Sequence, residues 1–186
     1  MHERHSTENK ALAGSLLLAH PAMQDPSFRR SVVLLSAHGD DGAMGVVLNR
    51  PMGRHLGDLN AQFAAGPLAR VPVYQGGPVQ KEQLIIAAWQ PDPQAAGFKL
   101  YFGIDVDKAE TLQAQEGVHL RAFLGYSGWA KGQLEKELQH NTWVVTPVNP
   151  DLMDQKDGHD LWRAILAGLS PEWKLLSGEP EDLSGN

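Results

Sequence analysis

The residues of this sequence that could do chemistry are histidine, aspartate, asparagine, arginine and serine, because the 186-residue chain contains no cysteine. The absence of cysteine excludes thiolate nucleophiles, disulfides and the zinc sites that thiolates form. His38 is the histidine best placed for proton transfer, since it ends an apolar run and precedes Asp40 and Asp41, which could orient its imidazole. The interpretation that we favour is simpler: His38 makes hydrogen bonds within a hairpin loop.

Asn49 and Arg50 form a second candidate pair at the end of the next apolar run. An amide and a guanidinium side by side could bind a carboxylate or a phosphate. Alternatively, Asn49 only caps the end of a strand. Pro51 restricts Arg50 to an extended backbone in either case, so the sequence leaves both interpretations open.

Two glycine-containing motifs are weaker indications. Gly76 and Gly77 could present backbone N–H groups to an anion, but no GxGxxG pattern surrounds them, so a structural turn is the simpler explanation. The segment GYSGW at residues 125–129 is placed where a hydrolase nucleophile elbow would lie, after a predicted strand and before a predicted helix. That elbow needs glycine where Trp129 stands. We therefore do not expect Ser127 to be a nucleophile, whereas Trp129 could line a groove.

The acidic residues and histidines do not predict a metal site. Asp105 and Asp107 suit the start of a helix, while Asp151, Asp154 and Asp157 lack the spacing of a calcium loop. The eight histidines form neither an i,i+4 pair nor an HxH pair. We therefore expect no metal ion and no cofactor.

The elements that must position these residues are predicted from the periodicity of apolar residues. Residues 31–37 and 44–49 form two β-branched runs, and the glycines and aspartates of residues 38–42 between them predict a hairpin loop of about four or five residues. Further strands are expected at residues 15–19, 71–75, 84–89, 98–103, 119–126 and 142–148. Helices are expected at 105–115, 132–140 and 160–169, with a short one near 56–64 and a stop at Ser170 and Pro171. Because strands and helices do not alternate regularly, the pattern favours an α+β fold with a mixed, mostly antiparallel sheet and flanking helices.

Composition limits the domain count and the partners. With 42% hydrophobic and 20% charged residues, the chain is typical of one folded domain, which we place at residues 11–176 between flexible tails at 1–10 and 177–186. Its 16 basic and 22 acidic residues give a net charge of −6, which argues against nonspecific binding to nucleic acid. No apolar run approaches the roughly 20 residues of a membrane-spanning helix, and the charged first residues do not suit a signal peptide. We expect a cytoplasmic protein with no membrane association.

Several blocks resemble the YqgE/AlgH family when taken together and in order. They are GSLLLAHPAMQDPSF at residues 14–28, SVVLL at 31–35 with His38, GAMGVVLNRP at 42–51, GGPV at 76–79, RAFLGYSGW at 121–129, GQLE at 132–135 and NTW at 141–143. The resemblance covers about residues 11–175. It departs from the family at Ser127, where the family often has alanine, and at Lys131, where it often has proline. The first departure is a further argument against a serine nucleophile.

The resemblance implies a bacterial cytosolic protein whose strands curl into a pseudo-barrel and whose biochemical function is unassigned. The AlgH label implies a transcriptional regulator of alginate production, which the acidic chain could perform only indirectly. We therefore expect a non-catalytic regulatory or binding domain whose partner is another protein or a small anionic ligand, without direct binding to DNA. The candidate binding surface comprises His38, Asn49, Arg50, Gly76, Gly77, Tyr126 and Trp129. The alternative is a small-molecule enzyme in which His38 is the general base and Asn49 and Arg50 bind an anionic substrate, which requires these side chains to converge on one pocket.

Overall fold

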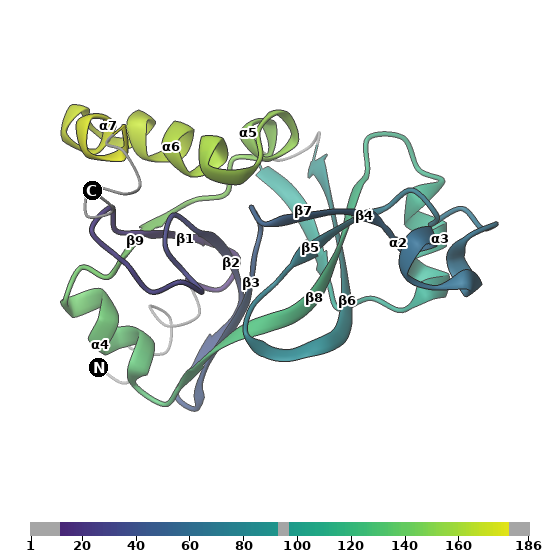
Figure 1. Ribbon diagram of the computed structural model, residues 1–186, viewed down its shortest axis with the longest axis horizontal. Helices are drawn as coiled ribbons and strands as arrows, with labels where there is room; N and C mark the ends of the chain where they lie inside the picture. The colour runs from purple at the N-terminus through teal and green to yellow at the C-terminus, as the bar shows by residue number, and fades with distance from the viewer. Residues whose placement is uncertain (1–11, 93–96, 179–186) are drawn as a thin grey trace, which may run out of the picture.

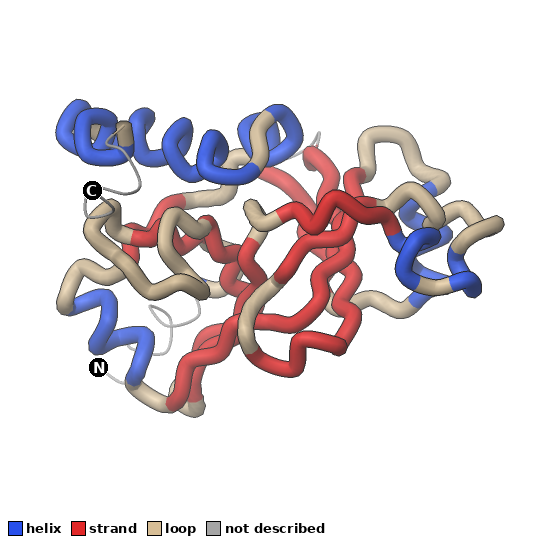
Figure 2. Tube along the Cα trace, viewed as in Figure 1, coloured by secondary structure: helices blue, strands red, loops and turns tan. Residues whose placement is uncertain are grey.

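The computed structural model describes residues 12–92 and 97–178, which form an α+β fold with a nine-stranded sheet at its centre and helices at its margins (Figure 1; Figure 2). The strand order is β4-β5-β8-β3-β2-β1-β9, and β6 and β7 branch from β8. The strands are β1 (Leu16–Ala19), β2 (Val32–Gly39), β3 (Gly42–Val47), β4 (Pro51–His55), β5 (Pro72–Gln75), β6 (Val79–Asp92), β7 (Gly97–Phe102), β8 (His119–Ala130) and β9 (Trp143–Thr146). Every strand pair is antiparallel except β5–β8.

Strand β8 joins the two halves of the sheet. Its first part pairs with β5 and β6, whereas its last four residues pair with β3. The sheet therefore curls into a half-barrel, which confirms the expected α+β fold. Because β8 continues to Ala130, the GYSGW segment lies inside a strand and not, as the sequence suggested, in a turn between a strand and a helix.

The β2–β3 hairpin is confirmed, but its loop is shorter than predicted. Gly39 pairs with Gly42, so only Asp40 and Asp41 lie between the strands. His38 is consequently part of the ladder, opposite Ala43, and does not belong to the loop.

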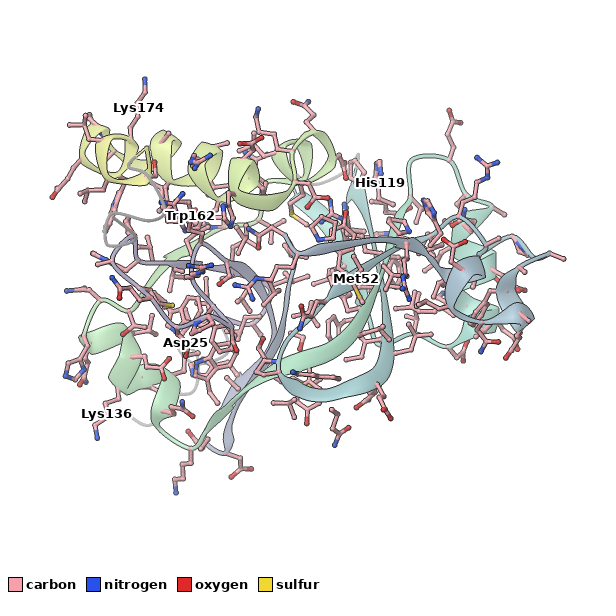
Figure 3. All side chains as sticks on the ribbon, in the orientation of Figure 1. Asp25, Met52, His119, Lys136, Trp162 and Lys174 are labelled. Atoms are coloured by element: carbon pink, nitrogen blue, oxygen red, sulfur yellow. The ribbon has the colours of Figure 1, made fainter. Side chains whose placement is uncertain are left out.

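Helices cover three sides of the sheet (Figure 1). They are α2 (Leu56–Leu59), the 3₁₀ helix η1 (Ala61–Phe63), α3 (Val106–Gln113), α4 (Gln133–Gln139), α5 (Pro150–Gln155), α6 (Gly158–Leu169) and α7 (Pro171–Ser177). The Asp105 carboxylate caps α3 by accepting the N–H of Lys108 at 2.7 Å, as the acidic helix start predicted. Helices α5, α6 and α7 form one layer along the sheet, and fully buried Trp162 of α6 donates its indole N–H to Ala19 O at 2.9 Å (Figure 3).

Three elements were absent from the sequence prediction. Strand β4 is exposed throughout and has no apolar alternation to indicate it. Helix α7 begins where a stop was expected: Ser170 is its N-cap and Pro171 its first residue, a position that proline favours. Helix α5 likewise begins at a proline, Pro150, and includes Asp154, at a place where no helix was predicted.

The predicted tails lie largely outside the described residues. Residues 1–10 are not described, and the predicted tail at 177–186 overlaps α7 at Ser177, with residues 179–186 not described. Within the described ranges, no helix is long and apolar enough to cross a membrane.

Candidate functional site

The connection between β5 and β6 crosses strand β8 at a point where the backbones approach closely. Gly76 donates its N–H to β8 at 2.8 Å, and its carbonyl accepts an N–H from β3 at 2.9 Å. A Cβ added to Gly77 would lie 2.2 Å from Tyr126 O, so a larger residue does not fit. The glycine pair therefore forms a close backbone crossing, in agreement with the structural turn that the sequence favoured.

A cavity of about 190 Å³ lies beside this crossing. It is formed by the loop before β2, the end of β3 and the β5–β6 connection, and we call it the Arg50–Lys81 cavity. Its lining consists of two prolines together with Ser27, Val47, Arg50, Gln75, Gly77 and Lys81. Two of these residues are cationic and none is acidic, so the local charge is opposite to that of the whole chain, which is −6.

Arg50 is held in this cavity by its backbone and by its side chain. Its carbonyl accepts the N–H of Gln75 at 2.9 Å, and its guanidinium donates to Arg29 O at 3.1 Å. The guanidinium is therefore anchored to the loop that forms another wall of the cavity. Such anchoring lowers the conformational entropy lost when a ligand binds.

The side chain of Asn49 is bonded to backbone groups and does not line the Arg50–Lys81 cavity. Its side-chain oxygen accepts the N–H of Val32 at 2.9 Å, and its amide group donates to Arg30 O and Gly158 O, both at 2.9 Å. The residue is 2% exposed. Of the two interpretations left open, the structure favours the cap: Asn49 ties the end of β3 to β2 and to the start of α6.

His38 is bonded to the carboxylate of Glu135, which lies far from it in the sequence. Its Nε2 contacts Glu135 Oε1 of α4, and its side chain is almost fully buried. His38 is six residues along β2 from Val32, the partner of Asn49, which corresponds to about 20 Å. The structure therefore does not bring His38 together with Asn49 and Arg50, as the enzyme alternative requires.

The contact between His38 and Glu135 predicts that Glu135 stabilises the folded protein. We expect Glu135→Ala to lower the free energy of unfolding by about 1 kcal/mol, because a buried imidazole loses one hydrogen-bonding partner and α4 loses an anchor. Urea denaturation measures this change. Glu110→Ala, at an exposed position of α3, serves as the control and should change stability by less than about 0.5 kcal/mol. Equal losses in the two variants would contradict an anchoring role.

The remaining predicted residues are packed within the sheet. Ser127 is fully buried and its hydroxyl donates to Gly76 O at 3.1 Å, which agrees with the expectation that it is not a nucleophile. Trp129 is 6% exposed and donates its indole N–H to Glu137 at 3.1 Å, so it does not line a groove. Tyr126 is half-buried and packs on the main core. Of the seven predicted surface residues, only Arg50 and Gly77 line the Arg50–Lys81 cavity.

A second polar cluster was not predicted. Arg121 of β8 is 7% exposed, and its guanidinium carbon lies 4.5 Å from the ring centroid of Tyr74 and 5.2 Å from that of Trp89. It donates to the backbone carbonyls of Leu48 and Met153. This buried guanidinium therefore links β8 both to the segment after β3 and to α5.

The two aromatic rings around Arg121 are each bonded to a carboxylate of the helical layer. Tyr74 donates its hydroxyl to Asp157 at 2.7 Å, and Trp89 donates its indole N–H to Asp154 at 3.1 Å. Burial raises the pKa of the Tyr74 hydroxyl well above its ordinary value, the charge of Arg121 opposes this rise, and the hydrogen bond to Asp157 adds to it. Tyr74 is therefore a neutral hydrogen-bond donor at physiological pH.

A cavity of about 360 Å³ adjoins this cluster, and we call it the Arg121 cavity. Its polar and aromatic lining comprises Arg70, Tyr74, Trp89, Gln113, His119, Arg121 and Asp154. His119 contacts Asp154 of α5 with an N–O distance of 3.2 Å. The arginine within an apolar strand was the one sequence signal that could have indicated this site.

Metal binding has no support in the described ranges, because they contain no cluster of three histidine or acidic side chains that could hold an ion. The fold and the two cavities define a class of protein: an α+β half-barrel with a layer of three helices along its sheet and arginine-lined cavities beside its strands. A sequence model described as AlgH-like matches residues 16–174. The chain therefore belongs to the AlgH-like family, which confirms the resemblance found in the sequence.

Individual relatives match nearly the whole chain. A UPF0301 protein of Streptomyces avermitilis is 37% identical, covering 97% of this chain and 98% of the relative. One from Mycobacterium tuberculosis is 35% identical, covering 94% and 90%. The solution structure of the AlgH protein from Pseudomonas aeruginosa is similar with a TM-score of 0.65 and 29% identity, covering 92% of this chain and 95% of that one. A crystal structure from Corynebacterium diphtheriae, with a TM-score of 0.71, 23% identity and coverage of 90% and 92%, is similar in fold.

Proposed function

We propose that this chain is a non-catalytic regulatory protein that binds a small anion, such as phosphate or a small carboxylate, in the Arg50–Lys81 cavity. The main support is the charge of the lining, which among the described residues combines two cationic side chains with no acidic one. Guanidinium and ammonium groups form short, charge-assisted hydrogen bonds with phosphate and carboxylate oxygens. In an acidic protein, such a local concentration of positive charge favours a negatively charged ligand.

The dimensions of the cavity limit the ligand. Sites for drug-sized organic molecules usually measure about 300–1,000 Å³, and the Arg50–Lys81 cavity is smaller, at about 190 Å³. It suits a single phosphate or carboxylate group. A larger ligand would have to extend out of the cavity into solvent.

Binding without turnover is favoured over the enzyme alternative by the positions of the reactive side chains. His38 lies about 20 Å along the sheet from Asn49, beyond the reach of a general base. The hydroxyl of Ser127 is buried and bonded to Gly76. Neither group lines the Arg50–Lys81 cavity.

A regulatory role in a bacterial cytoplasm is the most specific part of the proposal, and it rests on the family label and the absence of cysteine. A net charge of −6 disfavours direct binding to DNA. Regulation of transcription would then pass through a protein partner that responds to the bound anion.

Titration with inorganic phosphate tests the anion site. We expect Arg50→Gln and Lys81→Gln each to weaken binding about tenfold, because each removes one charged donor. Chemical shift changes in ¹⁵N-labelled protein give the affinity and locate the site. Binding to the unmodified protein should also weaken as ionic strength rises.

The matched control is Lys174→Gln, because Lys174 is exposed on α7 and points away from the protein (Figure 3). It removes the same charge at a distance from the cavity and should change affinity less than twofold, on the order expected for a screened surface charge. Equal weakening by Lys174→Gln and Lys81→Gln would mean that phosphate responds only to net charge. That result, or no binding at millimolar phosphate, would refute the proposed function.

A further inference from the structure

We propose that the Arg121 cavity is a second binding site, specific for an organic monocarboxylate: a ligand with one carboxylate on a compact apolar body. The two cavities have no lining residue in common. The second site is therefore independent of the anion site on which the proposed function rests.

The first argument is the charge state of Arg121. Its guanidinium is buried, and within residues 12–92 and 97–178 it forms no ion pair with a carboxylate. Within the described residues, its hydrogen bonds go to two backbone carbonyls, whereas a guanidinium has five N–H donors. A buried charge without a direct counter-charge is unfavourable, and a ligand carboxylate would supply that counter-charge with matching geometry.

The second argument is that Arg121 is already held in place. Tyr74 and Trp89 stack on its guanidinium, and Asp157 and Asp154 fix these two rings by hydrogen bonds. The guanidinium therefore needs little reorganisation to bind a ligand. Pre-organisation of this kind lowers the entropic cost of binding.

The third argument is the charge around the mouth of the cavity, which selects a single carboxylate. Arg70 is exposed at the lining and adds a second guanidinium. Asp154, already bonded to Trp89 and paired with His119, adds one negative charge that would repel a polyanion. With two guanidinium groups and one carboxylate, the cavity carries a positive charge that a single ligand carboxylate would neutralise. The second negative charge of a phosphate dianion would remain unbalanced, so phosphate is disfavoured.

The fourth argument concerns the body of the ligand. At about 360 Å³ the cavity falls within the size range of sites for small organic molecules. Val71, Pro72, Val118 and Leu120 line it together with the aromatic rings. These four residues could contact a compact apolar body, while the polar side chains of the lining hold the carboxylate.

The test compares benzoate with neutral benzamide of the same shape, using the unmodified protein. We expect benzoate at millimolar concentration to shift the ¹⁵N resonances of residues 70–74, 118–121 and the Arg121 side-chain N–H, and benzamide to bind about tenfold more weakly. Equal binding of the two compounds would overturn the proposal. So would benzoate shifts that map elsewhere, or no shifts.

Two variants refine the test. Arg70→Gln should weaken benzoate binding about threefold, while Arg54→Gln, which removes the same charge from exposed strand β4, should leave it unchanged. Arg121→Lys keeps the positive charge but removes the parallel N–H donors of the planar guanidinium. It should weaken benzoate binding about tenfold if the variant folds. If Arg70→Gln behaves like Arg54→Gln, the assigned cavity is wrong.

The same measurements separate this proposal from the proposed function. Lys81→Gln should leave benzoate affinity unchanged, and Arg70→Gln should leave phosphate affinity unchanged, because each residue lines only one cavity. Loss of benzoate binding in Lys81→Gln would assign benzoate to the Arg50–Lys81 cavity and overturn the second site alone.

Discussion

Gly125→Ala should lower the free energy of unfolding by about 3 kcal/mol. Gly125 has φ +77°, a left-handed conformation that costs an L-residue about 1–2 kcal/mol. An added Cβ would also lie 2.6 Å from Gly77 O and 3.1 Å from Lys81 Cα, so the crossing strands must move apart. Forced displacement in a packed region typically adds about 1–3 kcal/mol. Urea denaturation with two-state analysis measures the sum.

The matched control is Gly103→Ala. Gly103 has φ +66°, close to that of Gly125, but an added Cβ would meet no atom within 4 Å. Its substitution should therefore cost only the backbone preference, about 1–2 kcal/mol. Equal losses in the two variants would show that the close crossing contributes nothing. Because Gly77 lines the Arg50–Lys81 cavity, Gly125→Ala should also weaken phosphate binding, whereas Gly103→Ala should not.

The elements that could be predicted from the sequence are those with local signals. The β-branched runs before and after Asp40 and Asp41 predict β2 and β3, and the acidic start of α3 predicts its cap. Strand β4 had no such signal, since its Pro-Met-Gly-Arg-His sequence is exposed throughout and depends on pairing with β5. Pro171 was expected to stop a helix but in fact begins α7, and Pro150 likewise begins α5, because proline is compatible with the first turn.

The sites depend on long-range contacts, which limits what the sequence can reveal. Arg50 was found because its residue type and its position before a proline stand out locally. Its companion Lys81 follows a crossing loop that no local pattern predicts. The Arg121 cluster draws on segments near residues 74, 89 and 154, which lie far apart in the sequence. The cluster was not predicted because its members are distant in the sequence, although their residue types are suited to binding.

Asn49→Ala should lower the free energy of unfolding by about 3 kcal/mol, because three backbone groups lose their partner. Val32 N–H, Arg30 O and Gly158 O are each bonded to the Asn49 side chain, and the site is buried. Leaving a buried polar group unsatisfied costs about 1–3 kcal/mol. Since Gly158 begins α6, amide hydrogen exchange should also accelerate at the first turn of that helix.

Asn60→Ala is the matched control, because Asn60 is exposed and makes one capping bond, to Gln62 N at 2.9 Å. It should cost only about 1 kcal/mol. Asn49→Asp gives the sharper contrast: it places a carboxylate oxygen opposite the carbonyls of Arg30 and Gly158, so it should destabilise more than Asn49→Ala. If Asn49 instead binds an anion directly, both Asn49 variants would weaken phosphate binding and leave stability near that of the unmodified protein. The order of unfolding free energies therefore decides between a cap and a ligand-binding residue.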